Sequence, residues 1–252
     1  MKPTVVLRHL HEARIAHYRD NCSVGASDDE VVQLYLWNSE LAAALSEVLG
    51  FVEVALRHTI DTQLRIWSAQ QTGSELWIDQ LDKLPNLQSS FATSRRNLYK
   101  AADESRKSRR SDHPRQGEGI NHDDLVAHVM FGTWGTLLPE KFNANRVHAD
   151  GTFVQDQQNL QARRDLWKDT LHAAFPMVAM DPRGFGTGNK VRDLRKLRNR
   201  VSHMDSLLYV NVENLHNHVL MPLLNSIDNE LRDWAVVHSR VKKVLAERPS
   251  GS

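Results

Sequence analysis

Arg198, Asn199 and His203 are the residues of this sequence whose types and spacing best suit chemistry, within the run RNRVSH over residues 198–203. The arginine guanidinium is a permanently charged, planar group that matches phosphate oxygens. Histidine titrates near neutral pH and can accept or donate a proton. The asparagine amide can hydrogen-bond a neighbouring ring or a phosphate oxygen. These three side chains therefore predict phosphate chemistry.

Residues 189–209 must position these side chains. Apolar residues recur there at spacings of three and four, which predicts an amphipathic helix with Asn199 and His203 on its polar side. Arg198 lies about 140° around an ideal helix from His203. The two groups can meet at one phosphate if the helix ends near Ser202, or if a two-fold dimer supplies a second copy.

Basic residues on the same helix form a stripe that we expect to attract RNA, namely Arg192, Arg195 and Lys196. A second basic region runs from Arg95 to Arg115. Residues 100–121 are predicted to form a mobile loop, because they are polar and contain proline and glycine. This loop is either a solvated linker or a strap that contacts RNA through Arg106, Lys107, Arg109 and Arg110.

A long helix is predicted over residues 29–69, with its start at Ser27 or Asp28 and a weak point at Gly50. Glu53, Arg57 and Asp61 follow one another at i+4 spacing, which predicts a ladder of opposite charges. The surrounding residues are mostly apolar, so we expect these charges to be partly buried and paired. Glu53, Arg57 and His58 are therefore candidates for a role that supports the site.

Two other patterns are not interpreted as sites. The run DPRGFGTGN over residues 181–189 contains three alternating glycines, but no strand precedes it, so a plain loop is favoured over a phosphate-binding loop. His122 and His128 lack a third ligand at suitable spacing. No metal ion and no cofactor is predicted.

Composition limits the class of protein. The 252 residues are 40% hydrophobic and 25% charged, with a net charge of +1 and one cysteine, Cys22. These values are ordinary for a soluble globular protein in a reducing compartment. The low net charge means that any RNA contact depends on a local patch. Without a signal peptide or an apolar run long enough for a membrane span, a cytoplasmic location is expected.

Strand signals are scarce along the whole chain. The periodicity predicts an all-α, multi-helix bundle of roughly seven to nine helices, with no substantial sheet. The first helix is expected within residues 5–20, and the last over residues 212–237 with a kink at Pro222. A single domain over residues 5–237 and a disordered tail over residues 248–252 complete this prediction.

Three separated segments carry a resemblance to a known family: residues 34–60, residues 123–138 with FGTW at 131–134, and residues 197–205 with RNRVSH. Together they resemble the Abi-like (abortive infection) proteins of the HEPN superfamily, over roughly residues 5–235. The sequence departs from that family's pattern in having His58 after the first-block arginine. It also has Met204-Asp205-Ser206 where a His-Glu-Pro type of sequence often follows the motif histidine.

The resemblance implies a HEPN-type core and a metal-independent endoribonuclease that arrests growth during defence against phage. His203 would transfer a proton, Arg198 would stabilise phosphate charge and Asn199 would orient the histidine or a phosphate oxygen. One histidine does not readily serve as both base and acid, so a homodimer with a composite site is expected. The alternatives are a non-catalytic RNA- or nucleotide-binding HEPN module, and an interaction protein with an antitoxin or regulatory partner.

Overall fold

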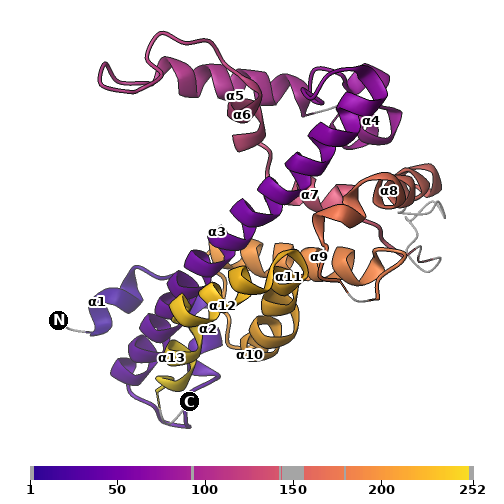
Figure 1. The fold of residues 1–252 in the computed structure, drawn as a ribbon. Coiled ribbons are helices and arrows are strands. Elements are labelled where there is room, and N and C mark those ends of the chain that lie inside the picture. The colour runs from indigo at the N-terminus through magenta and orange to yellow at the C-terminus, as the bar shows by residue number, and fades with distance from the viewer. Residues whose placement is uncertain (1–2, 92–93, 142, 144–155, 179, 250–252) are drawn as a thin grey trace, which may run out of the picture. The chain divides into compact units, whose positions relative to one another are not determined.

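Helices make up all the regular structure in the computed structural model, which describes residues 3–91, 94–141, 143, 156–178 and 180–249 (Figure 1). No strand occurs within these ranges. The prediction of an all-α fold is confirmed. None of the helices in this described part of the chain is both long and apolar enough to cross a membrane.

Helix α3, Asp28–Thr72, is the longest element and has the position that the sequence predicts (Figure 1). Its start is fixed by a reciprocal cap, in which the Ser27 hydroxyl accepts from the Glu30 amide and the Glu30 carboxylate accepts from the Ser27 amide. One face of the helix is buried along its length; Leu34, Leu45, Leu56 and Leu64 are fully buried on it. A Cβ added at Gly50 would meet nothing within 4 Å, so this glycine is not required for close packing.

The chain divides into two compact units. Unit 1 consists of residues 1–52, 193–225 and 229–252, and unit 2 of residues 53–192 and 226–228. A helix of 45 residues extends about 65 Å at 1.5 Å per residue, which is longer than one small core. Different helices therefore cover its two halves.

Unit 1 contains mostly short helices around the first half of α3. They are α1 (Pro3–Arg8), α2 (Glu12–Arg19), the end of α9 (Phe185–Ser202), α10 (Val212–Leu215), most of α11 (Met221–Ile227), α12 (Asn229–His238) and α13 (Val241–Ala246). Its core includes Leu34, Leu45, Leu194, Leu220 and Leu223, all fully buried. The indole of Trp37 donates a 2.7 Å hydrogen bond to the Val244 carbonyl, which ties α13 to α3.

The predicted helices at the two ends of the chain are wrong in detail. Residues 5–20 are divided between α1 and α2, and residues 212–237 are divided among α10, a π-helical turn at His216–Leu220, α11 and α12. Pro222 lacks an amide hydrogen, and its ring would clash with the carbonyl four residues before it. The wider π turn, in which the Met221 amide bonds to the His216 carbonyl, lies immediately before this proline.

Unit 2 contains the second half of α3 and an aromatic core. Its other helices are η1 (Leu81–Lys83), α4 (Pro85–Phe91), α5 (Arg95–Lys107), α6 (His122–Ala127), α7 (Phe131–Leu137), α8 (Gln157–Asp169), η2 (Leu171–Ala174) and the start of α9. Trp77 is fully buried, and its ring centroid lies 5.0 Å from that of Phe91 and 6.2 Å from that of Trp134. Aromatic side chains of this size supply much of the apolar area that a small core buries.

The glycine-rich run over residues 181–189 is only partly a loop, because α9 begins within it at Phe185. The carboxylate of Asp181 accepts hydrogen bonds from the Gly186 and Thr187 amides, so the chain's own anion occupies this helix N-terminus. A Cβ on Gly188 would lie 2.1 Å from the Pro139 carbonyl oxygen. These glycines therefore allow close packing of the backbone, which agrees with the interpretation that this run is not a phosphate-binding loop.

Candidate functional site

Helix α9 ends at Ser202, so His203 is the first residue after the helix. Two hydrogen bonds close the end: the Met204 amide donates to the Val201 carbonyl at 3.1 Å, and the Asp205 amide to the Arg200 carbonyl at 2.8 Å. This is the Schellman pattern, which requires a left-handed residue after the cap and usually has glycine there. Met204 adopts it with φ = 52°. The helix therefore ends at Ser202, which is one of the two arrangements that would let Arg198 and His203 meet at one phosphate.

The three motif side chains differ in their exposure. Asn199 and His203 are exposed, and Arg198 is half-buried beside the buried Leu197 and Val201. The His203 amide makes the last helical hydrogen bond, 3.0 Å to the Asn199 carbonyl. The backbone of the histidine is therefore fixed by the helix end, while its ring is accessible to a large ligand.

Three residues hold the segment after His203, and no feature of the local sequence indicated them. The Arg14 guanidinium donates a 2.7 Å hydrogen bond to the Met204 carbonyl, and the buried Asn38 amide accepts one of 2.8 Å from the Leu207 amide. Asn21 donates to the Tyr209 hydroxyl at 2.7 Å. These contacts come from α2, the turn that follows it and α3, more than 160 positions away in the sequence.

Tyr209 is an aromatic side chain on the surface of unit 1. It is 65% exposed, and its ring centroid lies 6.0 Å from that of the exposed His17 in an edge-on arrangement. Because its hydroxyl is held by Asn21, the ring is kept in place, six residues after His203. An ordered, exposed aromatic ring is a surface on which an unpaired base can stack.

The basic stripe predicted on α9 is partly neutralised by neighbouring acids. Arg192 lies 3.8 Å from a carboxylate oxygen of Glu140, and Lys196 lies 3.6 Å from one of Asp193. Arg195 is half-buried. A cation that is paired with a carboxylate attracts RNA less strongly than an isolated cation does. Exposed ion pairs are weak, however, and water readily separates the two side chains.

The predicted supporting residues Glu53, Arg57 and His58 belong to unit 2, whereas the motif belongs to unit 1. Glu53 and Arg57 lie 3.5 Å apart, and His58 is exposed. The third member of the predicted ladder, Asp61, is buried and paired as expected. Its helical partner is Arg65, one turn further along α3.

The basic region over residues 100–121 is more regular than predicted. Residues 100–107 belong to α5, where Arg106 and Lys107 pair with Asp103 at 2.8 Å and 2.6 Å. Arg110 is highly exposed and lies 3.5 Å from Asp112. A polar, charged helix is compatible with the composition that suggested a loop, because charges at i, i+3 and i, i+4 spacing support one another.

Arg109 is the main correction to the predicted strap, because its side chain is only 8% exposed. It donates hydrogen bonds to both oxygens of Asp124 and to the carbonyls of Arg115 and Glu118. Arg115 also binds Asp124, at 2.8 Å, and it is the main reason that the pKa of this carboxyl is lowered to about 2. Arg109 therefore packs within the loop, and its hydrogen bonds hold the loop together.

A polar cluster in the interior of unit 2 was not predicted as a site. Asp61 accepts hydrogen bonds from Trp77 Nε1 at 2.8 Å, His122 Nε2 at 3.1 Å and Arg65 Nε at 2.7 Å. Burial alone would raise the pKa of Asp61, but the donors, His122 first, together lower it. A cavity of about 400 Å³ adjoins this cluster, and Arg65 and His122 are among the residues that line it.

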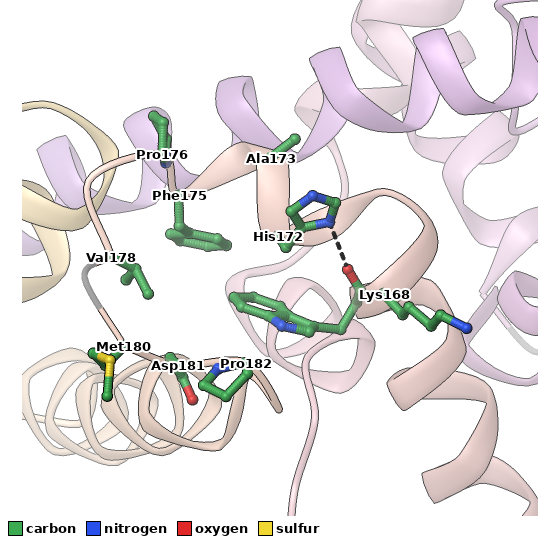
Figure 2. A pocket seen from close by; sticks show the side chains of 10 residues that line it. Lys168, His172, Ala173, Phe175, Pro176, Val178, Met180, Asp181 and Pro182 are labelled. Carbon is green, nitrogen blue, oxygen red and sulfur yellow. Dashed lines mark hydrogen bonds between the residues drawn. The ribbon is translucent and has the colours of Figure 1, made fainter.

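A second cavity in unit 2, of about 550 Å³, is mostly apolar (Figure 2). Its lining consists of Trp167, Lys168, His172, Ala173, Phe175, Pro176, Val178, Met180, Asp181 and Pro182. His172 Nδ1 lies 3.1 Å from the Trp167 carbonyl oxygen, a hydrogen bond that fixes the imidazole at the rim. Its ionisable lining residues are Lys168, His172 and Asp181.

Neither metal-ligand geometry nor comparison with known proteins identifies a further site or function. Within the described ranges, no group of three or more His, Cys, Asp or Glu side chains could hold a metal ion. Comparison of the chain with protein-family models, curated proteins and solved structures finds no match. The family resemblance of residues 198–203 and the two other segments is therefore a hypothesis that rests on the sequence.

Proposed function

We propose that this chain is a metal-independent endoribonuclease whose reacting groups are Arg198, Asn199 and His203. The observation that carries the proposal is the end of α9 at Ser202, which leaves an exposed His203 at the helix cap, with Asn199 exposed four residues before it. Arginine, asparagine and histidine at one helix end supply a phosphate ligand, an orienting amide and a proton carrier.

RNA supplies its own nucleophile, the 2′-hydroxyl group. In the proposed reaction His203 removes the proton from this hydroxyl, and the oxygen attacks the adjacent phosphorus. The bond from phosphorus to the 5′-oxygen breaks, which leaves a 2′,3′-cyclic phosphate and a 5′-hydroxyl once the leaving oxygen is protonated. Arg198 stabilises the negative charge that develops on the phosphate oxygens.

Protonation of the leaving oxygen requires an acid on the opposite side of the phosphorus from the base. The proposal therefore includes a two-fold homodimer, in which a second copy of the segment supplies a second His203. Arg192, Arg195 and Lys196 would guide RNA to this composite site, Arg192 and Lys196 to the extent that Glu140 and Asp193 release them. Tyr209 extends the surface available to the nucleotides that flank the scissile phosphate.

The biological role that we propose is that of a growth-arresting toxin in abortive infection against phage, acting in the cytoplasm. A toxin of this kind requires restraint, so an antitoxin or another regulatory partner is part of the proposal. This role rests on the sequence resemblance of the three segments.

Analysis of reaction products tests the proposed chemistry. Purified protein is incubated with a defined single-stranded RNA in excess EDTA, and with the same oligonucleotide carrying 2′-deoxyribose at every position. We expect cleavage of the RNA alone, with 2′,3′-cyclic phosphate and 5′-hydroxyl ends. Binding without any product would support the non-catalytic RNA-binding alternative, and strict dependence on magnesium would exclude the proposed mechanism.

Mixing of variants tests the composite site. Arg198→Ala and His203→Ala proteins, each inactive alone, are unfolded together and refolded so that heterodimers form. The heterodimer retains only one His203, so the mixture should stay inactive if the site needs both histidines, and recovery of activity would show that a single His203 suffices. Full activity of a protein that sediments as a monomer at the assay concentration would contradict the dimer.

A further inference from the structure

The mostly apolar cavity of unit 2 has a polar side and an apolar side. Its volume of about 550 Å³ lies within the range of small-molecule sites. Lys168, in the last turn of α8, and His172, in η2, lie together on one side of it (Figure 2). The other side is formed by Val178, Met180 and Pro182. A ligand that matches this arrangement has one polar end and an apolar body.

Trp167 supplies a hydrogen-bond donor to this cavity. The side chain is 3% exposed, and its indole Nε1–H has no acceptor among the residues that the structure describes. Nε1 is not one of the unpartnered polar atoms that are fully buried, a group that includes the indole nitrogen of Trp134. The small exposed part of Trp167 therefore includes Nε1, and Trp167 lines the cavity. A nearly buried donor without a partner costs free energy, which an acceptor on a ligand would recover.

Lys168 supplies positive charge at the rim of the cavity. Its side chain is exposed, and no carboxylate of the described residues lies within ion-pair distance of its ammonium group. The flexible four-carbon stem lets this group turn toward a ligand. The imidazole of His172 is fixed on the same side, because its Nδ1 donates the 3.1 Å hydrogen bond to the Trp167 carbonyl oxygen. A proton on its second nitrogen, Nε2, would add to the positive charge.

The carboxylate of Asp181 is the acidic group of the lining, and its oxygens are already bound. They accept hydrogen bonds from the Gly186 amide at 3.2 Å, the Thr187 amide at 2.7 Å and the Thr187 hydroxyl at 2.9 Å. The dipole of α9, which begins at Phe185, further offsets this negative charge. With Asp181 compensated and Lys168 unpaired within the described ranges, the cavity favours an anion over a cation.

We propose that this cavity binds an aliphatic carboxylate, such as the anion of a medium-chain fatty acid. The carboxylate would accept a hydrogen bond from Trp167 Nε1–H and pair with Lys168. The hydrocarbon chain would lie against the apolar side, formed by Val178, Met180 and Pro182. The lining residues belong to unit 2, whereas Arg198, Asn199 and His203 belong to unit 1, so this site is separate from the proposed ribonuclease activity.

Calorimetric titration of the full chain with sodium decanoate tests the proposal. We expect saturable binding with a Kd below about 1 mM. Decyltrimethylammonium has the same hydrocarbon chain with the opposite charge, and it should bind at least about tenfold more weakly. Acetate has the carboxylate without the chain, and it should not saturate over the same range of concentration, because burial of the chain supplies most of the affinity.

Substitutions in the lining test both ends of the ligand. Lys168→Gln should weaken decanoate binding about threefold or more, and Lys83→Gln, which removes the same charge from an exposed residue of unit 2 outside the cavity, should have almost no effect. Ala173→Leu places a larger side chain in the cavity and should weaken binding at least about tenfold. Ala173→Ser keeps the size and is the matched control. Ala173 is exposed, so both variants should retain the wild-type midpoint of thermal unfolding.

A spectroscopic measurement tests the hydrogen bond from Trp167. A proton–nitrogen correlation NMR spectrum of isotope-labelled protein has one indole N–H signal for each of the six tryptophans, and Trp167→Phe identifies the signal of Trp167. Decanoate should shift this signal more than the other five, toward the position of a hydrogen-bonded indole. The proposal is overturned if decanoate does not bind saturably, if decyltrimethylammonium binds equally well, if Lys83→Gln weakens binding as much as Lys168→Gln, or if the Trp167 signal does not move.

Discussion

Two histidines of this chain occupy opposite environments. His203 is exposed at the end of α9. The residues proposed to act with it, Arg198, Asn199 and Tyr209, lie within six positions of it in the sequence. His122 is buried, and its partner Asp61 is 61 positions away. An exposed group on one helix can be recognised from spacing, because the helix itself sets the geometry. A buried group depends on which segments the fold brings together.

The two environments also predict different consequences of substitution. Exposed polar residues contribute little to stability, so their loss should affect activity and leave folding intact. Buried paired residues should behave in the opposite way, because removing one partner leaves other polar atoms unsatisfied. The variants below test this contrast between His203 and the Asp61–His122 pair.

His203→Ala should have the largest effect on activity. If His203 transfers the proton, cleavage of RNA in EDTA should fall by about 100-fold or more, while the midpoint of thermal unfolding stays within a few degrees of that of the wild type. Overexpression of the variant should also relieve the growth arrest caused by the wild-type protein. A folded His203→Ala protein that remains equally active and equally toxic would exclude the catalytic assignment.

Asp61→Ala should have the largest effect on stability. The substitution leaves Trp77 Nε1 and His122 Nε2 without their buried acceptor, which should cost about 3 kcal/mol in the free energy of unfolding. Urea denaturation measures this loss. Asp82→Ala is the control, since its carboxylate is 77% exposed and pairs with Arg95 at the surface, so less than about 1 kcal/mol is expected. Equal losses in the two variants would contradict the distinction.

Acid should weaken unit 2 through Asp124, whose pKa is lowered to about 2, chiefly by Arg115. A carboxyl with a lowered pKa in the folded state stabilises the protein above its unfolded pKa of about 3.9. This contribution is lost as the pH falls from about 4 to about 2. Asp124→Asn should therefore be less stable at neutral pH and show a smaller further loss over that interval. An unchanged acid profile in denaturant titrations would argue against the Arg115–Asp124 contact.

The sequence predicted the parts of the fold that depend on local periodicity. The start of α3 after its cap Ser27 follows from cap residues and apolar spacing within a few residues. The π turn before Pro222 and the helical start of α9 inside a glycine-rich run were missed. In both cases the outcome depends on how backbone groups pack and pair, as for Gly188 against the Pro139 carbonyl.

Part of the candidate site could likewise be proposed from local residue spacing. The proposed reacting side chains lie within or directly after one helix, so their spacing was enough to suggest them. The residues that hold the adjoining segment, Arg14 and Asn38, could not be found in this way, because they act through carbonyl and amide groups that are distant in sequence. The burial of Arg109 was missed for the same reason, since its partner Asp124 lies 15 positions further along the chain.

Arg14→Ala tests whether the backbone next to His203 must be held in place for activity. Loss of the 2.7 Å hydrogen bond to the Met204 carbonyl would loosen the backbone next to His203, so kcat should fall by about tenfold while KM changes little. Arg14→Lys keeps one donor and should restore part of kcat. Arg19→Ala, which removes an exposed arginine from the same helix, is the control. A change in KM alone would instead indicate that Arg14 binds RNA directly.

Met204→Gly should have the smallest effect, and it is expected to stabilise the protein. Met204 has φ = 52° at the position after the helix cap, where a side chain costs about 1 kcal/mol relative to glycine. Met204→Ala is the matched control, because it removes most of the side chain but keeps the unfavourable left-handed conformation. Urea denaturation should therefore place glycine above both methionine and alanine in the free energy of unfolding. If alanine stabilises as much as glycine, the gain comes from removing the exposed side chain, and the strain beside His203 is not the cause.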